Sequence, residues 1–284
     1  MRPFDYYSPY SLTDACNLLA DFGTNARILA GGTDVLVELR RPGTASPKAI
    51  VDISRIASLR GIRESGNLIL IGPLTTHAEV LRSEVIGTYA PLLRVAASTI
   101  GSPQIRNRGT VGGNLMNAAT CADAVPPLIA LNAEIRLTSS SGERSISLSE
   151  FFVKPYTTTA RHDEVLTEIR FPKLLQNARS SFIKLGRRNA LSIARLSVAA
   201  VLVKNSDGVV ADARIVPGAA FPKWQRIASA ENLLIGKKLS KELMAEAGQK
   251  VSEVMISFTG RRWSTEYKEP VIAVLVRRAL EACA

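Results

Sequence analysis

Two glycine pairs with hydroxyl neighbours are the residues of this chain best suited to binding an anion. They lie in AGGTD at residues 30–34 and in RGTVGGN at residues 108–114, the latter within a stretch, residues 103–127, that has few bulky core residues. Because glycine lacks a Cβ, backbone N–H groups at such turns approach a phosphate closely. Neither pair matches GxGxxG or GxxxxGK[ST], which disfavours a Rossmann or P-loop site. Either turn alone is more simply a chain reversal, whereas two such turns in one chain favour a site for a diphosphate.

Two polar residues follow the second glycine pair, and each has two interpretations. Asn114 is a turn residue that tolerates positive φ, or its amide donates to a ligand oxygen. Asp123 caps a helix that starts near Ala124, or it accepts from a ribose hydroxyl or a ring N–H. Periodicity does not decide between these roles.

Length and composition are those of a globular protein. The 284 residues are 46% hydrophobic and 21% charged, enough for a sizeable core and two or three domains. The sequence contains no run of 18 apolar residues, and its first ten residues lack signal-peptide features, so we expect a cytoplasmic protein without a membrane span.

The formal charge of +11 does not predict a nucleic-acid partner. Basic residues between positions 170 and 206 alternate with apolar ones and lack the aromatic interleaving of a single-strand binder. An anionic cofactor or an acidic partner subunit explains the charge more simply.

Hydrophobic patterns divide the chain into three parts, at residues 1–56, 57–175 and 176–284. The first reads as a helix at 11–22, a strand at 26–30, a glycine turn leading into a helix, and a strand at 49–54, which together predict a parallel βαβ unit. The second reads as a hairpin at 61–72, helices at 76–86 and 90–100, a helix running into a strand at 123–137, a turn and strand at 139–148, and a strand at 164–172. The third reads as a strand, a hairpin near 205–208, and helices at 222–236, 240–255 and 269–282.

Four segments together resemble one family. They are RILAGGTDVLVELR, QIRNRGTVGGNL with CADAVP downstream, KLGRRNALSIARLSVAA and VLVRRALE. They resemble the FAD-binding medium subunit of the molybdenum hydroxylases, which include xanthine, carbon monoxide and nicotinate dehydrogenases. The resemblance implies an α+β protein: a vanillyl-alcohol-oxidase (PCMH) type FAD-binding fold of two α/β subdomains, plus a C-terminal domain of antiparallel sheet and helices.

The resemblance also implies which residues contact FAD, and it implies no catalytic residue or metal ligand in this chain. The implied set is Ile28, Leu29, Ala30, Gly31, Gly32, Thr33, Asp34, Val35, Ile100, Thr110, Val111, Gly112, Gly113, Asn114, Asn117, Asp123, Leu166 and Lys184. The two glycine motifs would wrap the diphosphate, and the last two residues lie in segments that resemble flavin-contacting ones.

Three features of this sequence refine the expected substrate and cofactors within the family. Some relatives have histidine and serine where this chain has Thr33 and Asp34, which disfavours carbon monoxide oxidation. His77 and His162 lie outside the glycine motifs, so we expect non-covalent FAD. Three scattered cysteines cannot supply the four thiolates of an iron–sulfur cluster.

The function that the resemblance implies is electron transfer within a complex. A large molybdopterin subunit would oxidise the substrate, two [2Fe-2S] clusters of a small subunit would carry the electrons, and this chain would pass them through FAD to NAD, a quinone or another acceptor. A dimer of heterotrimers is expected. Substrate and acceptor are not readable from this chain.

Alternatives remain for the function and for four arginines. A self-contained FAD-dependent oxidoreductase of the same flavin fold is the first alternative function, and a noncatalytic nucleotide-binding module is the second. Arg106 and Arg108 face either the diphosphate or the iron–sulfur subunit, with docking favoured for Arg108. Arg187 and Arg188 face the flavin, the acceptor or solvent.

Overall fold

A computed structural model describes residues 3–188 and 190–284 of the chain. Its strands are β1 (Asp5–Tyr7), β2 (Ala26–Leu29), β3 (Ala49–Asp52), β4 (Ile62–Ser65), β5 (Leu68–Ile71), β6 (Glu134–Ser139), β7 (Gly142–Ser147), β8 (Phe152–Lys154), β9 (Thr157–Thr158), β10 (Val165–Pro172), β11 (Ala178–Leu185), β12 (Leu196–Lys204) and β13 (Val210–Gly218). Its α-helices are α1 (Leu12–Phe22), α2 (Val35–Leu39), α3 (His77–Arg82), α4 (Glu84–Tyr89), α5 (Pro91–Thr99), α6 (Pro103–Arg108), α7 (Val111–Asn117), α8 (Val125–Ala130), α9 (Leu148–Phe151), α10 (Ala228–Leu234), α11 (Lys241–Thr259) and α12 (Thr265–Glu281).

The N-terminal part contains the predicted parallel unit. Strands β2 and β3 are parallel, and β1 pairs with the other edge of β3, so the order is β1-β3-β2. Helix α1 begins where the Ser11 side chain accepts from Asp14 N and ends at Gly23, whose φ is +55°. The sequence did not predict β1, because three residues carry too little periodicity to mark a strand.

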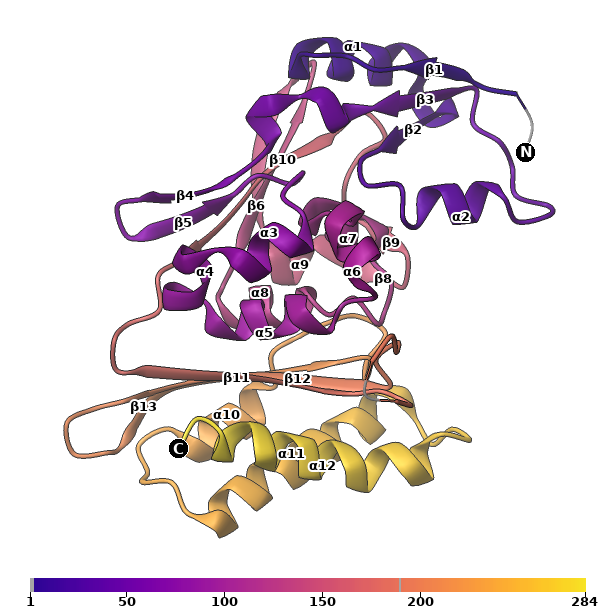
Figure 1. The fold of residues 1–284 in the computed structure, drawn as a ribbon. Coiled ribbons are helices and arrows are strands. Elements are labelled where there is room, and N and C mark those ends of the chain that lie inside the picture. The colour runs from indigo at the N-terminus through magenta and orange to yellow at the C-terminus, as the bar shows by residue number, and fades with distance from the viewer. Residues whose placement is uncertain (1–2, 189) are drawn as a thin grey trace.

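The second part is a five-stranded antiparallel sheet, in the order β4-β5-β10-β6-β7, with short helices packed beside it (Figure 1). The helix predicted at 76–86 is two helices, because Ser83 leaves helical geometry and its side chain caps α4. Helices α6 and α7 were not predicted, since their proline and glycine residues have low helix propensity. We keep 57 and 176 as proposed domain bounds.

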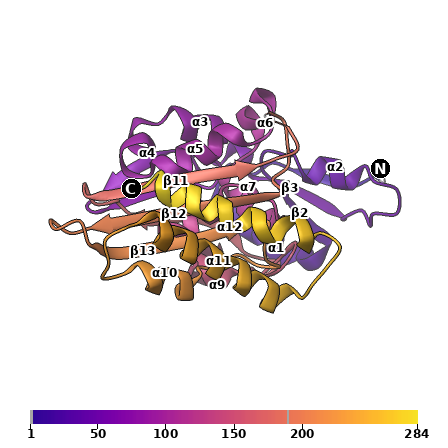
Figure 2. The same ribbon diagram turned by 90° about the horizontal axis from the view of Figure 1, so that it is seen from below.

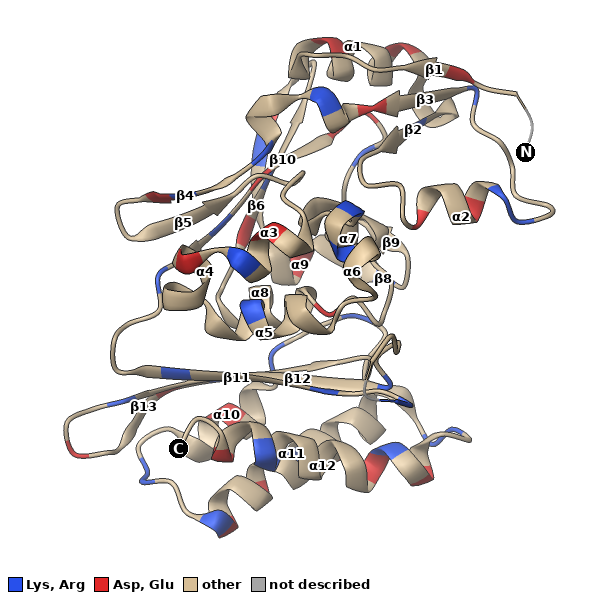
Figure 3. Cartoon of the chain, viewed as in Figure 1, with Lys and Arg blue, Asp and Glu red and all other residues tan. Residues whose placement is uncertain are grey.

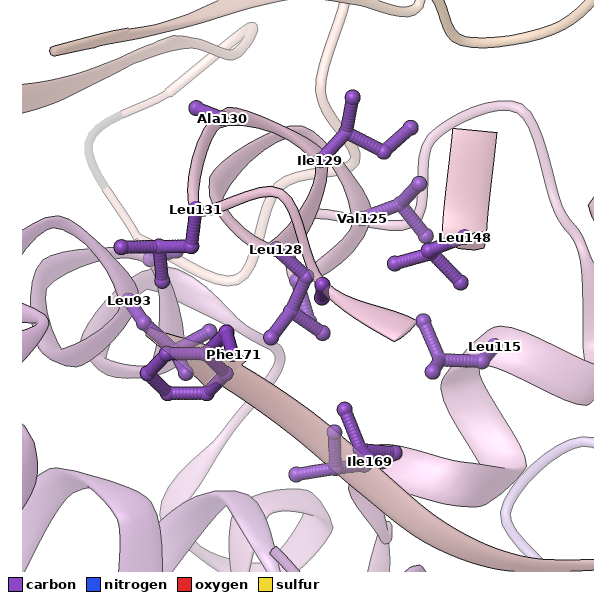
Figure 4. Packing of buried hydrophobic residues seen from close by; sticks show 14 of the residues in the cluster. Leu93, Leu115, Val125, Leu128, Ile129, Ala130, Leu131, Leu148, Ile169 and Phe171 are labelled. Atoms are coloured by element: carbon purple, nitrogen blue, oxygen red, sulfur yellow. The ribbon is translucent and has the colours of Figure 1, made fainter. Parts of the chain in front are cut away.

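The main hydrophobic core lies between this sheet and the helices around α8. Leu128 on α8, Leu115 on α7, and Ile169 and Phe171 on β10 are almost completely buried there, and Figure 4 shows them facing one another. Through Leu115, this core anchors α7, which contains the second glycine motif.

The C-terminal part is an antiparallel sheet covered by helices. Its order is β11-β12-β13, and α10, α11 and α12 lie over the face away from the second part (Figures 1 and 2). On β12, Ala199 and Val201 join the main core, whereas Val198, Ala200 and Leu202 join the core under the helices. Because side chains alternate along a strand, β12 is buried on both faces and binds the two parts together.

Charged residues do not form one basic face in the view of Figure 3, where acidic positions lie among the basic ones. None of the helices in the described part of the chain is both long enough and apolar enough to cross a membrane.

Candidate cofactor site

The two glycine motifs, distant in sequence, touch in the structure. A Cβ added to Gly31 would overlap the carbonyl oxygen of Arg108 and would lie 3.1 Å from the Cα of Gly109. A Cβ added to Gly109 would lie 3.5 Å from Thr33 Oγ1. Only glycine permits two backbone segments to approach this closely. Position 31 is therefore glycine because the two motifs meet there.

The first motif is a loop with unpaired backbone donors. It connects β2 to α2, and its backbone turns at Gly32, whose φ is +77°. Within the described residues, the N–H groups of Gly31 through Asp34 donate to no other group of the chain, and the first helical bond is from Leu36 N to Gly32 O. Four consecutive free N–H groups on a half-buried loop are a binding surface for an oxyanion.

The second motif is the first turn of a helix and not a separate glycine turn. It is the start of α7, capped by the Thr110 side chain, which accepts from Gly113 N at 3.0 Å. Val111 N donates to Thr75 O and Gly112 N donates to Pro73 O, both at 2.9 Å. These N–H groups are therefore already paired, and the expectation that the backbone N–H groups of the second glycine turn bind a phosphate is wrong. The Thr110 hydroxyl proton and the Asn114 side chain are the groups left to meet a ligand.

A third segment, residues 73–77, holds the second motif in place. Thr76 forms an isolated antiparallel bridge with Thr110, and His77 N donates to Gly109 O at 3.1 Å. A Cβ on Gly112 would lie 2.8 Å from Pro73 O, so only glycine lets this segment pack so closely, and the contact of Gly112 to FAD stays a prediction. Sequence analysis missed this segment, because its only local signal is the Thr76–Glu79 capping box.

Asn114 has an unsatisfied oxygen. Its Oδ1 is buried without a hydrogen-bond partner, and Asn114 is absent from the described residues with positive φ. The turn interpretation of Asn114 is therefore wrong. A buried acceptor without a partner costs free energy unless a ligand or water completes it.

Asp123 forms a buried ion pair and not a helix cap. Helix α8 is capped at Ala124 without a side-chain bond, so the capping interpretation is wrong. Lys184 Nζ lies 2.6 Å from Asp123 Oδ2 and donates to Thr99 O at 3.0 Å. Burial raises the pKa of Asp123 to about 6, against the opposing effect of the Lys184 charge. Asp123 Oδ1 is buried without a partner, as Asn114 Oδ1 is.

Asp123 and Lys184 line a hollow of about 310 Å³ between the second and C-terminal parts. Its other walls include Gly101 and Cys121 from the second part and Ile193 from the loop after β11. Burial is the main cause that raises the pKa of the Cys121 thiol, so this thiol is protonated at neutral pH.

The other residues predicted to contact FAD lie on neighbouring elements and differ in how deeply they are buried. Ile28 and Leu29 are on β2, and Ala30 and Val35 flank the first loop. Ile100 and Asn117 are half-buried at the ends of α5 and α7, whereas Leu166 is 3% exposed within the main core on β10. Contacts from these residues to FAD stay predictions.

The four arginines divide into structural and exposed ones. Arg106 Nη1 donates to the carbonyl oxygens of Ile100 and Gly101, at 2.9 and 3.2 Å, so it fixes the end of α5. Arg108 and Arg187 are exposed, and the exposed Arg188 donates to Leu191 O.

This arrangement fits FAD. The free N–H groups of the first loop suit the diphosphate, and the unpartnered oxygens of Asn114 and Asp123 are acceptors for the donors of a flavin nucleotide. The described residues hold no group of three or more histidines, cysteines and carboxylates placed to bind a metal ion.

Comparison with known proteins decides the family. Residues 2–174 match the family described as the FAD binding domain in molybdopterin dehydrogenase, and residues 181–283 match the CO dehydrogenase flavoprotein C-terminal domain. The chain belongs to this family of FAD-binding medium subunits. Its flavoprotein nature and its place in an oxidoreductase of the molybdenum hydroxylase family follow from that membership.

Relatives of this family match along almost their whole length. The carbon monoxide dehydrogenase medium chain of Hydrogenophaga pseudoflava is 32% identical over 98% of this chain and 96% of its own length. The 6-hydroxypseudooxynicotine dehydrogenase complex subunit alpha of Paenarthrobacter nicotinovorans is 35% identical over 99% of this chain and 95% of its own.

Solved structures confirm the predicted fold. A carbon monoxide dehydrogenase from Hydrogenophaga pseudoflava superimposes with a TM-score of 0.92 at 32% identity, covering 100% of this chain and 98% of that chain. Quinoline 2-oxidoreductase from Pseudomonas putida 86 superimposes with a TM-score of 0.90 at 25% identity, covering 99% and 97%. The fold is therefore the expected flavin-binding fold with the C-terminal domain of medium subunits.

Proposed function

We propose that this chain is the exit of electrons from a molybdenum hydroxylase complex, holding FAD between the [2Fe-2S] clusters of a partner and an external acceptor. When bound, FAD supplies the exchange between one-electron and two-electron transfer. The task of the chain's own residues is to bind, orient and shield this cofactor. The proposal gives no residue of this chain a role as an acid, base or nucleophile.

The observation that carries the proposal is the junction of the two glycine motifs. It places the free N–H groups of Gly31 through Asp34 beside Thr110, while Asn114 Oδ1 and Asp123 Oδ1 provide unpartnered acceptors. We infer that the first loop binds the diphosphate through its backbone. Thr110 would donate its hydroxyl proton to the same group. Lys184 would hold Asp123 in place at the hollow and keep a positive charge there.

The partners belong to the proposal as well. Relatives are named as medium chains or as a subunit of a dehydrogenase complex, which supports an assembly with other subunits. We propose a large molybdopterin subunit, a small subunit with two [2Fe-2S] clusters, and a dimer of such heterotrimers in the cytoplasm. The acceptor is NAD, a quinone or another oxidant.

Reconstitution of the purified chain tests FAD binding. We expect one FAD per chain, a flavin absorption spectrum, release of FAD on denaturation because it is not covalently bound, and no oxidation of organic substrates by the chain alone. A chain that stays colourless after reconstitution would overturn the proposal. Substrate oxidation by the isolated flavoprotein would support the self-contained oxidoreductase instead.

Purification of the tagged chain from its native cells tests the partners. We expect two further subunits to copurify, with about four iron atoms per FAD, since each [2Fe-2S] cluster holds two, together with molybdenum. Copurification without iron or molybdenum would contradict the proposed electron path while leaving FAD binding intact.

A further inference from the structure

The connection between α11 and α12 carries an exposed indole that the proposed cofactor site does not use. Trp263 is 90% exposed, more than any other large hydrophobic residue in the described part of the chain. Phe258 at the end of α11 and Tyr267 at the start of α12 are 54% and 45% exposed. Exposed apolar residues scattered singly are ordinary, whereas several aromatic ones gathered on one turn mark an interaction surface. We call residues 258–269 together with Arg195 the Trp263 patch.

Three cations of the Trp263 patch have no acidic partner. Arg262 and Lys268 donate to main-chain carbonyl oxygens, and the Arg195 guanidinium lies over the ring of Tyr267, with its Cζ 5.0 Å from the ring centroid. None of these three cations pairs with a carboxylate within the described residues. Burial lowers the pKa of Lys268, and the charges of Arg195 and Arg262 lower it further, so the three cations lie close enough to repel one another. An anion placed among them would relieve this repulsion.

Two carboxylates also belong to the Trp263 patch. Glu269 is held by Arg261, with 2.9 Å between Oε2 and Nη1, and Glu266 is exposed on the first turn of α12. The patch therefore has four basic side chains against two acidic ones, a net charge of +2. Its surface combines exposed aromatic rings with an excess of positive charge.

We propose that the Trp263 patch is a docking surface for an acidic segment of a partner subunit of the same complex. The carboxylates of that segment would face the three unpaired cations, and its apolar side chains would cover the indole. This inference rests on the proposed function, because it requires the other subunits. Tryptophan, tyrosine and arginine are the residues that most often dominate the binding energy of protein–protein interfaces. Complementary charges would fix the orientation in which the two subunits meet.

Other occupants fit the Trp263 patch less well. A symmetric dimer of this chain through the patch would bring the same cations against one another. A single-stranded nucleic acid needs successive free aromatic faces, whereas Arg195 already covers one face of Tyr267. An anionic membrane attracts polybasic segments, and it would repel the exposed Glu266. A protein segment can place a basic residue opposite Glu266, which a lipid surface cannot.

Footprinting of the native complex tests the inference. The chain has two tryptophans, and the other, Trp224, is 4% exposed. We expect hydroxyl radicals to oxidise Trp263 in the isolated chain and to oxidise it about tenfold more slowly in the complex, because the centre of an interface is packed as closely as a protein interior. Peptide mass spectrometry measures both rates, and Trp224 should stay protected in both samples.

The composition of the purified complex separates the possible failures. Equal oxidation of Trp263 in the isolated chain and in a complex that contains iron and molybdenum would overturn this inference alone. A chain that purifies without other subunits would overturn the proposed assembly and this inference with it.

Matched variants test the indole and the charge separately. Trp263→Ala and Arg262→Glu should each weaken retention of the partner subunits about tenfold. Lys237→Glu is the control, because Lys237 is exposed before the other end of α11, whose 19 residues span about 28 Å. It should retain the partners as the wild type does. FAD content and melting temperature should stay close to those of the wild type in all three variants, since the side chains are exposed. Wild-type retention by both Trp263→Ala and Arg262→Glu would contradict the inference.

The isolated chain tests the other occupants with the same footprint. We expect Trp263 to be oxidised equally fast with and without phosphatidylglycerol vesicles or single-stranded poly(dT), and sedimentation to show no self-association that protects it. Protection of Trp263 by the vesicles, by poly(dT) or by self-association would overturn the assignment of the Trp263 patch to a partner subunit.

Discussion

Lys184 and Asp123 form an ion pair, 2.6 Å between Nζ and Oδ2, that joins strand β11 of the C-terminal sheet to the loop before α8. Both side chains are less than a tenth exposed. Because each charge has lost its hydration, each depends on the other. The ion pair therefore stabilises the contact between the second and C-terminal parts, at the hollow that we propose for the cofactor.

Lys184→Met should destabilise the free chain by about 3 kcal/mol at pH 8, because Asp123 is then a buried charge without a partner. At pH 5 the loss should be smaller, since Asp123 can bind a proton there. Urea unfolding at both pH values measures this. The matched control is the double variant with Asp123→Asn, which should recover part of the loss. An equal loss at both pH values would contradict the buried-charge explanation.

Asp123 and His77 should give opposite slopes of stability against pH. The folded pKa of Asp123, about 6, lies above its model value of 3.8, so its stabilising contribution is full at low pH and is lost as pH rises through about 6. The folded pKa of His77, about 4, lies below 6.5, so its contribution is full above 6.5 and is lost as pH falls toward 4. Each amounts to about 3 kcal/mol, and they nearly cancel between pH 4 and 6.

Single variants should separate the two slopes in the free chain. Relative to the wild type, Asp123→Asn should lose stability as pH falls from 6.5 to 4.5, and His77→Gln should gain it. Chemical unfolding at several pH values measures both, and other carboxylates titrate equally in all three proteins. Parallel curves for the wild type and both variants would show that neither group is perturbed by burial.

Gly113→Ala and Gly112→Ala should have different effects. A Cβ on Gly113 meets only Thr110 Oγ1, at 2.9 Å, whereas a Cβ on Gly112 overlaps Pro73. We expect Gly113→Ala to weaken FAD binding at least tenfold with a small change in melting temperature, and Gly112→Ala to lower the melting temperature of the free chain by several degrees. Flavin titration and thermal unfolding together decide this. If Gly112→Ala lost FAD without a fall in melting temperature, a side chain at position 112 would meet the diphosphate and not Pro73.

Asn114→Ala should leave the free chain as stable as the wild type, or more stable by up to about 1 kcal/mol, because it removes a buried oxygen without a partner. FAD affinity should fall by about tenfold if that oxygen accepts from the cofactor. Equilibrium dialysis with FAD measures the affinity. A destabilised free chain with unchanged FAD affinity would assign Asn114 to the fold alone.

Arg108→Gln should leave FAD binding and melting temperature unchanged and should weaken retention of the partner subunits, because Arg108 is exposed at the rim of the junction. Arg106→Gln is the contrasting variant. It removes the bonds to the Ile100 and Gly101 carbonyls and should lower the melting temperature. Affinity purification at rising salt concentration measures retention of the partner subunits. Loss of FAD from Arg108→Gln would show instead that Arg108 contacts the diphosphate.

Local patterns in the sequence were sufficient to predict the helices and strands that have strong hydrophobic periodicity. Helix α1, the parallel pair β2 and β3, the β4–β5 hairpin and the long strand β10 appear where alternation and caps predicted them. The helix predicted at 222–236 is shorter, Ala228–Leu234, and the one predicted at 269–282 begins earlier, at Thr265, with Pro270 inside it. Tertiary packing overrides local propensity at such ends.

The sequence by itself determined that two glycine motifs exist and that their residue types suit a diphosphate; the flavin followed from the family resemblance. Only the tertiary structure decided what each glycine does. Gly31 admits the backbone of Arg108, Gly112 admits Pro73, and the N–H groups of the second motif are consumed by residues 73–77. It also decided that Asp123 pairs with Lys184, 61 residues away. Hydrogen bonds and close approaches between distant segments leave no periodic trace in a sequence, because they depend on how already formed elements pack.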